Sequence, residues 1–79
     1  MKRTVNLDKL NNIYYLLEAA SEDEEYENIF NRYKKSKTGR LRLDIIECDL
    51  IFNLYDEMWL EISEMTEDYV ESVIYRNVK

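Results

Sequence analysis

The side chains of this protein with the clearest chemical potential are its carboxylates, because they are numerous and regularly spaced. Between Leu43 and Tyr75 the chain holds ten Asp or Glu residues and no Lys or Arg, whereas six of its eleven basic residues lie within residues 32–42. Five of the acids recur at steps of four and three, namely Glu57, Glu61, Glu64, Asp68 and Glu71. If residues 57–71 form one helix, these five side chains stack within a sector of about 80° as a single acidic ridge. The chemistry that such a ridge predicts is the recognition of positive charge.

Catalysis by these carboxylates is not predicted. A neighbouring pair such as Asp56 and Glu57 could do general acid–base work and Cys48 could act as a nucleophile, but the chain has no histidine, phosphate-binding loop or paired nucleophile and base. The acidic stretch at residues 22–27 lacks the ligand order and the glycine of a calcium loop, and one cysteine cannot build a zinc site. We therefore expect a non-enzymatic protein with no cofactor and no metal.

Length and composition predict one domain over residues 1–79. Its core is small, and a core of this size supplies only about 3–5 kcal/mol unless a second subunit, a metal or disulfides add to it. Cys48 is the only cysteine and lies among apolar residues, so we expect a small buried hydrophobic side chain. No signal-peptide core or membrane-length apolar run is visible, which predicts a cytoplasmic location and no membrane partner. The net charge of −6 argues against direct binding to nucleic acid.

The periodicity predicts an all-α fold, a small bundle of three to four helices that begins with a helical hairpin. Apolar residues step by three and four through residues 7–20 after Asn6, which is a plausible N-cap. Ser21 and Glu24 have the spacing of a capping box and predict the start of a second helix, with Gly39 placed to cap its end. After Gly39, apolar Leu41, Leu43 and Ile45 alternate with Arg40, Arg42 and Asp44, and this is the one place where a short strand competes with helix.

We predict one long C-terminal helix over residues 43–76, because apolar side chains recur every three or four positions from Ile51 to Val73. Ser63 and Thr66 are candidate capping residues, so a kink or a break into two helices near them stays open. The first half of this helix is apolar all round and must either run through the middle of the fold or meet a second copy. Phe52 and Trp59, seven positions apart on one flank, are the residues predicted for self-association.

Seven tyrosines are unusual in so short a chain. The periodicity places five of them on inner stripes, namely Tyr14, Tyr26, Tyr33, Tyr55 and Tyr69, and leaves Tyr15 and Tyr75 as the better candidates for partner contact.

From these features we expect a protein that presents the acidic ridge, flanked by Asp56 and Glu67, to a protein partner with a basic surface. Carboxylates on successive helical turns lie about 5–6 Å apart, close to the phosphate spacing of a nucleic-acid strand, so the expected partner is a nucleic-acid-binding enzyme or complex. In size, acidity and tyrosine content the chain is similar to the inhibitors, anti-CRISPR proteins among them, that phages and mobile elements direct against host nucleases and RNA-guided complexes. Two alternatives stay open: a dimeric regulatory or scaffold module that uses the apolar flank, and a nucleic-acid binder that uses the basic segment 32–42.

Overall fold

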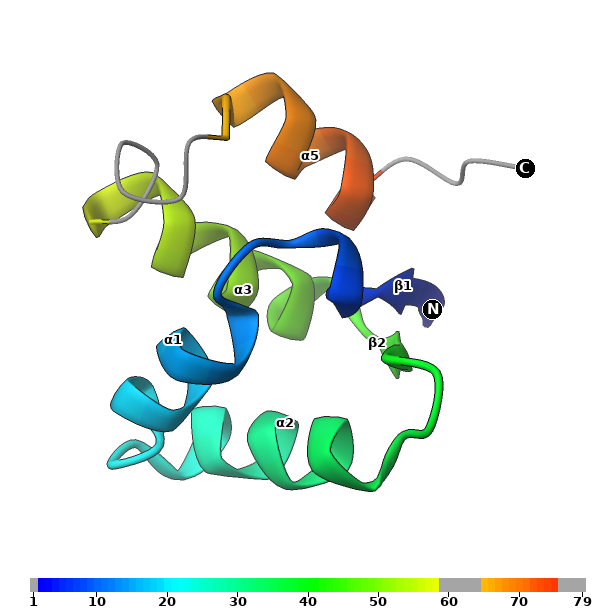
Figure 1. The fold of residues 1–79 in the computed structure, drawn as a ribbon, viewed down its shortest axis with the longest axis vertical. Coiled ribbons are helices and arrows are strands. Elements are labelled where there is room, and N and C mark those ends of the chain that lie inside the picture. The colour runs from blue at the N-terminus through cyan, green and yellow to red at the C-terminus, as the bar shows by residue number, and fades with distance from the viewer. Residues whose placement is uncertain (1, 59–64, 76–79) are drawn as a thin grey trace.

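The computed structural model describes residues 2–58 and 65–75, which form a mostly helical fold with a small two-stranded sheet (Figure 1). Its elements are, in chain order, β1 (Arg3–Asn6), the 3-10 helix η1 (Leu7–Lys9), α1 (Ile13–Ala20), α2 (Glu24–Lys35), β2 (Arg40–Leu43), α3 (Ile45–Met58) and α5 (Glu67–Tyr75). Helices α1 and α2 form the expected hairpin, and α3 lies between this hairpin and α5 in Figure 1, with the sheet beside one end of α3. Among the described residues, no helix has the length and the apolar character needed to cross a membrane.

The sheet corrects the prediction of a purely helical fold. Strand β1 pairs antiparallel with β2, with Val5 opposite Leu41 and Thr4 opposite Arg42. The alternation along residues 40–43 places Leu41 and Leu43 in the core and leaves their arginine neighbours exposed, as expected of a half-buried strand. The alternative reading of this segment as a strand is thus confirmed, although its partner at the N-terminus was not predicted.

Side chains from the end of α2 cover the outer edge of β2. Ser36 Oγ donates to the carbonyl of Arg40 at 3.1 Å, and Arg32 donates to the carbonyl of Arg42 at 2.6 Å. The N–H of Arg40 donates to Thr38 Oγ1 at 3.4 Å. Because these backbone groups are occupied, this edge is protected against pairing with a further strand.

The first predicted helix, residues 7–20, is in fact two pieces. Asn6 is the cap that the sequence predicts, since its side chain accepts a hydrogen bond from the N–H of Asp8, but the turn that it starts is the short η1. Asn12 adopts a left-handed backbone with φ of 62° and separates η1 from α1. Asparagine tolerates this conformation better than most residues, which explains the break in an otherwise periodic segment.

The predicted capping residues of the second helix were wrong. Ser21 donates its hydroxyl to the carbonyl of Glu18 and so closes α1, while Asp23 occupies the N-cap position of α2. Helix α2 ends at Lys35, and Gly39, with φ of 76°, instead forms the turn into β2. Gly39 also accepts a hydrogen bond at its carbonyl from the N–H of Leu7, at 2.8 Å, which extends the β1–β2 ladder.

The prediction of a single C-terminal helix was also wrong, and the alternative of a break near Thr66 is correct. Residues 65 and 66 are not helical, and Thr66 caps α5 by accepting a hydrogen bond from the N–H of Tyr69 at 3.1 Å. Ser63, the other predicted capping residue, lies outside the described residues. Helix α3 begins with a capping box that was not predicted, in which Asp44 and Glu47 each accept from the other's N–H.

One apolar core joins all these elements. Among residues 2–58 and 65–75, fifteen buried side chains belong to it, including Ile51 and Tyr55 of α3 and Val70 and Ile74 of α5. Cys48 is fully buried among them, as predicted, and burial raises the pKa of its thiol. The burial of Cys48, Ile51 and Tyr55 supports the prediction that this segment runs through the middle of the fold.

Tyrosine hydroxyls connect the elements around this core. Tyr26 donates to the carbonyl of Leu50, Tyr55 to that of Asn11 at 2.6 Å, and Tyr69 to that of Lys9 at 3.1 Å. Tyr33 and Tyr75 donate to the carboxylates of Asp8 and Asp49. Each of these bonds crosses between elements, so much of the tyrosine content has a structural explanation.

Candidate functional site

The five acids predicted as one ridge do not share one helix. Glu57 lies on α3, with its side chain outside the described part, and Asp68 and Glu71 lie on α5. Glu61 and Glu64 lie outside the described residues. Because the chain leaves the helical path at residues 65 and 66, the acids before and after this point cannot line up along one axis. The comparison between the spacing of these carboxylates and that of the phosphates in a nucleic-acid strand therefore no longer applies, because it required a single continuous helix.

The acidic surface that remains is divided between two packed helices. Asp56, near the end of α3, and Glu67 and Asp68, in the first turn of α5, are exposed, while Glu71 is half-buried. We call these four residues the α3–α5 acidic surface. Glu67 and Asp68 interact favourably with the positive end of the α5 macrodipole, so they have a structural role as well.

The basic segment does not neutralise this surface. Within residues 2–58 and 65–75 the one salt bridge joins Arg32 to Glu47, which links α2 to the capping box of α3. Arg40 and Arg42 are exposed on β2, and the ammonium group of Lys34 lies 4.4 Å from the centre of the Phe30 ring. Internal pairing of the basic block with the α3–α5 acidic surface, which the sequence left open, is therefore absent from the described residues.

The apolar flank predicted for self-association is partly used within the molecule. Phe52 is half-buried, and its ring centre lies 5.6 Å from that of Tyr75. Trp59 lies outside the described residues. The larger exposed apolar side chains of α3 are instead Ile45 and Ile46 in its first turn, which are 54% and 68% exposed. Self-association stays a prediction.

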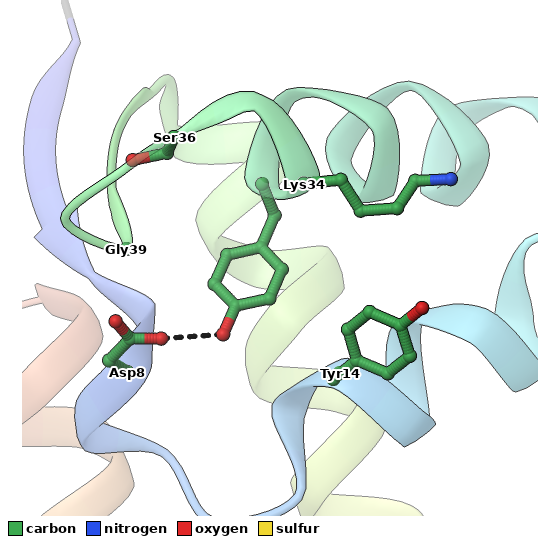
Figure 2. Close-up of a pocket in the computed structure, with 6 residues that line it drawn as sticks. Asp8, Tyr14, Lys34, Ser36 and Gly39 are labelled. Carbon is green, nitrogen blue, oxygen red and sulfur yellow. Dashed lines mark hydrogen bonds between the residues drawn. The ribbon is translucent and has the colours of Figure 1, made fainter.

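An open pocket lies where η1, the start of α1 and the end of α2 meet (Figure 2). Its volume is about 510 Å³, and it is lined by Asp8, Tyr14, Tyr33, Lys34, Ser36 and Gly39. A second hollow of about 350 Å³ shares the first three of these residues and extends to Tyr15. We call the two together the Asp8 groove. Tyr14 is 43% exposed and Tyr15 is 68% exposed, so the prediction that Tyr14 is a core residue was wrong, and Tyr15 stays a candidate for partner contact.

Asp8 and Tyr33 form the polar centre of this groove. The Tyr33 hydroxyl donates to Asp8 Oδ1 at 2.5 Å, and burial of the ring together with the Asp8 carboxylate raises the pKa of Tyr33 to about 12. Gly39 leaves room for that carboxylate, because a Cβ at this position would lie 2.2 Å from Asp8 Oδ2. The neutral hydroxyl of Tyr33 is thus the partner that the protein itself gives to Asp8.

The Asp8 groove adjoins α5. Tyr69 is 43% exposed, contrary to the prediction that it is a core residue, and its hydroxyl bonds to the carbonyl of Lys9, the residue after Asp8. Tyr75, the other candidate for partner contact, is half-buried, and burial and its bond to Asp49 raise its pKa. The groove was missed at the level of sequence because Asp8 and Tyr33 are 25 positions apart and no motif links them.

Among the described residues, no group of three or more His, Cys, Asp or Glu side chains is arranged to hold a metal ion. No family model matches the chain, and comparisons with curated proteins and with solved structures returned no match. The function is therefore inferred from the residues and their geometry.

Proposed function

We propose that this protein is a non-enzymatic binding protein that presents the α3–α5 acidic surface to a protein partner with a Lys- and Arg-rich surface. The observation that carries the proposal is the separation of charge: Asp56, Glu67 and Asp68 are exposed, and no Lys or Arg of the described residues pairs with them. Exposed carboxylates without intramolecular partners attract a cationic surface over a distance of about one Debye length.

The class of partner follows from this charge. A basic surface that normally binds nucleic acid is one target that fits, and blocking it by competition would make the protein an inhibitor of the phage or mobile-element type. The acids on two short helices provide charge complementarity without the regular spacing of a phosphate backbone. The proposal therefore rests on charge, and recognition of the partner needs further contacts.

Affinity capture with matched charge variants tests this function. The acidic-surface variant combines Asp56→Lys, Glu67→Gln and Asp68→Asn and changes the net charge by 2 + 1 + 1 = +4. The control combines Glu18→Lys and Glu22→Lys, two exposed acids near the α1–α2 connection, and changes the net charge by 2 + 2 = +4. We expect a basic protein that the wild type and the control capture from host lysate and the acidic-surface variant loses.

Equal capture by all three proteins would contradict the proposal, because binding would then not depend on these acids. An equal loss in both variants would also contradict it, because net charge alone would then explain binding. Folding of the variants is checked by circular dichroism. Lys at position 56 lies in the last turn of α3, where a cation interacts favourably with the helix macrodipole, so this substitution is not expected to unfold the helix.

Nucleic-acid binding by the basic segment is the second candidate. Arg40 and Arg42 share the exposed face of β2, and neither forms an ion pair with a described carboxylate. A gel shift with short DNA and RNA at low salt separates the two functions. Direct binding that is lost on Arg40→Gln and Arg42→Gln would support this candidate, and the absence of any shift would favour the acidic-surface proposal.

A further inference from the structure

The Asp8 groove combines a carboxylate with exposed tyrosine rings, a set of groups that favours a cation. Asp8 is exposed, and within residues 2–58 and 65–75 it forms no salt bridge. Its recorded side-chain partner is the neutral hydroxyl of Tyr33, so its negative charge is not balanced by a contact. Tyr14 and Tyr33 line the same pocket and provide aromatic surface beside this charge.

The same region already holds one cation against an aromatic ring. The ammonium group of Lys34 lies 4.4 Å from the centre of the Phe30 ring, and that ring packs edge-on against Tyr14 with 5.2 Å between the centres. Figure 2 shows the Lys34 side chain extended along α2, with its amino group directed away from Asp8. The cation of the protein itself thus leaves the Asp8 end of the groove open.

We propose that the Asp8 groove binds the guanidinium group of an arginine side chain from the partner protein. A planar guanidinium stacks on a tyrosine ring and donates at its edge to a carboxylate, which an ammonium group does less well. Asp8 accepts these hydrogen bonds, Tyr14 provides the stacking face, and Tyr33 holds the carboxylate in place. Lys34 also lines this pocket, and its positive charge lowers the affinity for the guanidinium group.

The inference rests on the proposed function, since it assigns one contact to the same basic partner. The hydrogen bond from Tyr69 of α5 to the carbonyl of Lys9 brings the groove next to the helix that carries most of the α3–α5 acidic surface. In the proposed complex, one partner with a Lys- and Arg-rich surface contacts both sites. The groove supplies the directional contact that exposed carboxylates alone lack.

Titration with short capped peptides tests the groove separately from the partner. We use Ac-Gly-Arg-Gly-NH₂ as the probe, with the Lys and Gln analogues as controls, and follow the backbone amide signals of the isotope-labelled full chain by NMR. We expect the Arg peptide to shift the signals of Asp8, Tyr14 and Gly39 in a saturable way, with weaker shifts from the Lys peptide and none from the Gln peptide.

Substitutions assign the roles. Asp8→Asn, which keeps an acceptor for Tyr33, is expected to weaken Arg-peptide binding at least about tenfold, and Lys34→Gln to strengthen it by about twofold or more. Tyr14→Phe keeps the affinity, whereas Tyr14→Ala lowers it. Glu22→Gln, an exposed acid in the α1–α2 connection, is the control and leaves peptide binding unchanged.

The inference is overturned if the Arg peptide shifts no signal in the groove, if the Lys or Gln peptide binds as tightly, or if Asp8→Asn has no effect. Such a result leaves the proposed function standing when capture of a basic protein still depends on Asp56, Glu67 and Asp68. Loss of that dependence together with saturable binding of the Arg peptide would instead remove the proposed function and keep the groove.

Discussion

Single side chains join segments of this protein that are far apart in sequence. Gly39, at the turn into β2, lies against Asp8 of η1, and Asp8 in turn accepts a hydrogen bond from Tyr33 of α2. None of these contacts could be predicted from the sequence, because propensity and periodicity describe neighbours along the chain and not pairs across the fold. Cys48 and Tyr55 were predicted correctly as buried, because their positions on an apolar helical stripe carry that information locally.

Gly39→Ala is expected to destabilise the protein. The positive φ of 76° costs a residue with a Cβ about 1–2 kcal/mol, and the new Cβ must also displace the Asp8 carboxylate. Urea unfolding measures the loss. In an Asp8→Ala background the loss should be smaller, because only the backbone strain remains, and an equal loss in both backgrounds would show that Asp8 does not contribute.

Tyr33 is expected to make the protein sensitive to alkaline pH. Its pKa is raised from an ordinary value of 10 to about 12 in the folded state, so the unfolded chain releases this proton first. The contribution of Tyr33 to the free energy of unfolding should therefore stay level below pH 10 and be lost as the pH rises from 10 to 12. Tyr33→Phe should make the fall in stability over this pH range shallower. Identical profiles for wild type and Tyr33→Phe would contradict the assignment.

At the scale of elements, the sequence predicts the helices better than their ends. The short connection between the two helices and the helical spacing of their apolar residues were sufficient to predict the α1–α2 hairpin. The pairing of β1 with β2 was not predictable, since four-residue strands carry little signal and their partners are more than thirty positions apart. The choice between one C-terminal helix and two depended on Thr66, whose capping hydrogen bond competes with continuation of the helix.

Thr66→Ala is expected to destabilise α5 by about 1 kcal/mol, because the N–H of Tyr69 loses its side-chain acceptor. Hydrogen exchange should show faster opening of the first turn of α5, with a smaller change in α1 and α2. Ser72→Ala in the same helix is the control and should cause no loss, since alanine has the higher helix propensity. Equal exchange rates in wild type and Thr66→Ala would show that the cap does not hold this end of α5.

At the scale of the whole molecule, the acids of the second half and the basic segment 32–42 are largely unpaired among the described residues. The exposed acids of α3 and α5 and the exposed cations at the end of α2 and on β2 do not pair with each other among the described residues. The excess of acids in the second half of the chain was readable from the sequence. The loss of a single ridge was not, because it depends on where the helix breaks. In the function proposed above, these acids attract a basic surface by charge alone, and specificity comes from sites such as the Asp8 groove.

The dependence of partner affinity on salt tests the acidic-surface proposal most directly. For the captured basic protein, we expect the wild type and the Glu18→Lys/Glu22→Lys control to lose about tenfold or more in affinity as NaCl rises from about 0.05 to 0.3 M. The Asp56→Lys/Glu67→Gln/Asp68→Asn variant should bind weakly at low salt and change little over the same range. Equal affinities and equal salt dependence for all three proteins would contradict the account.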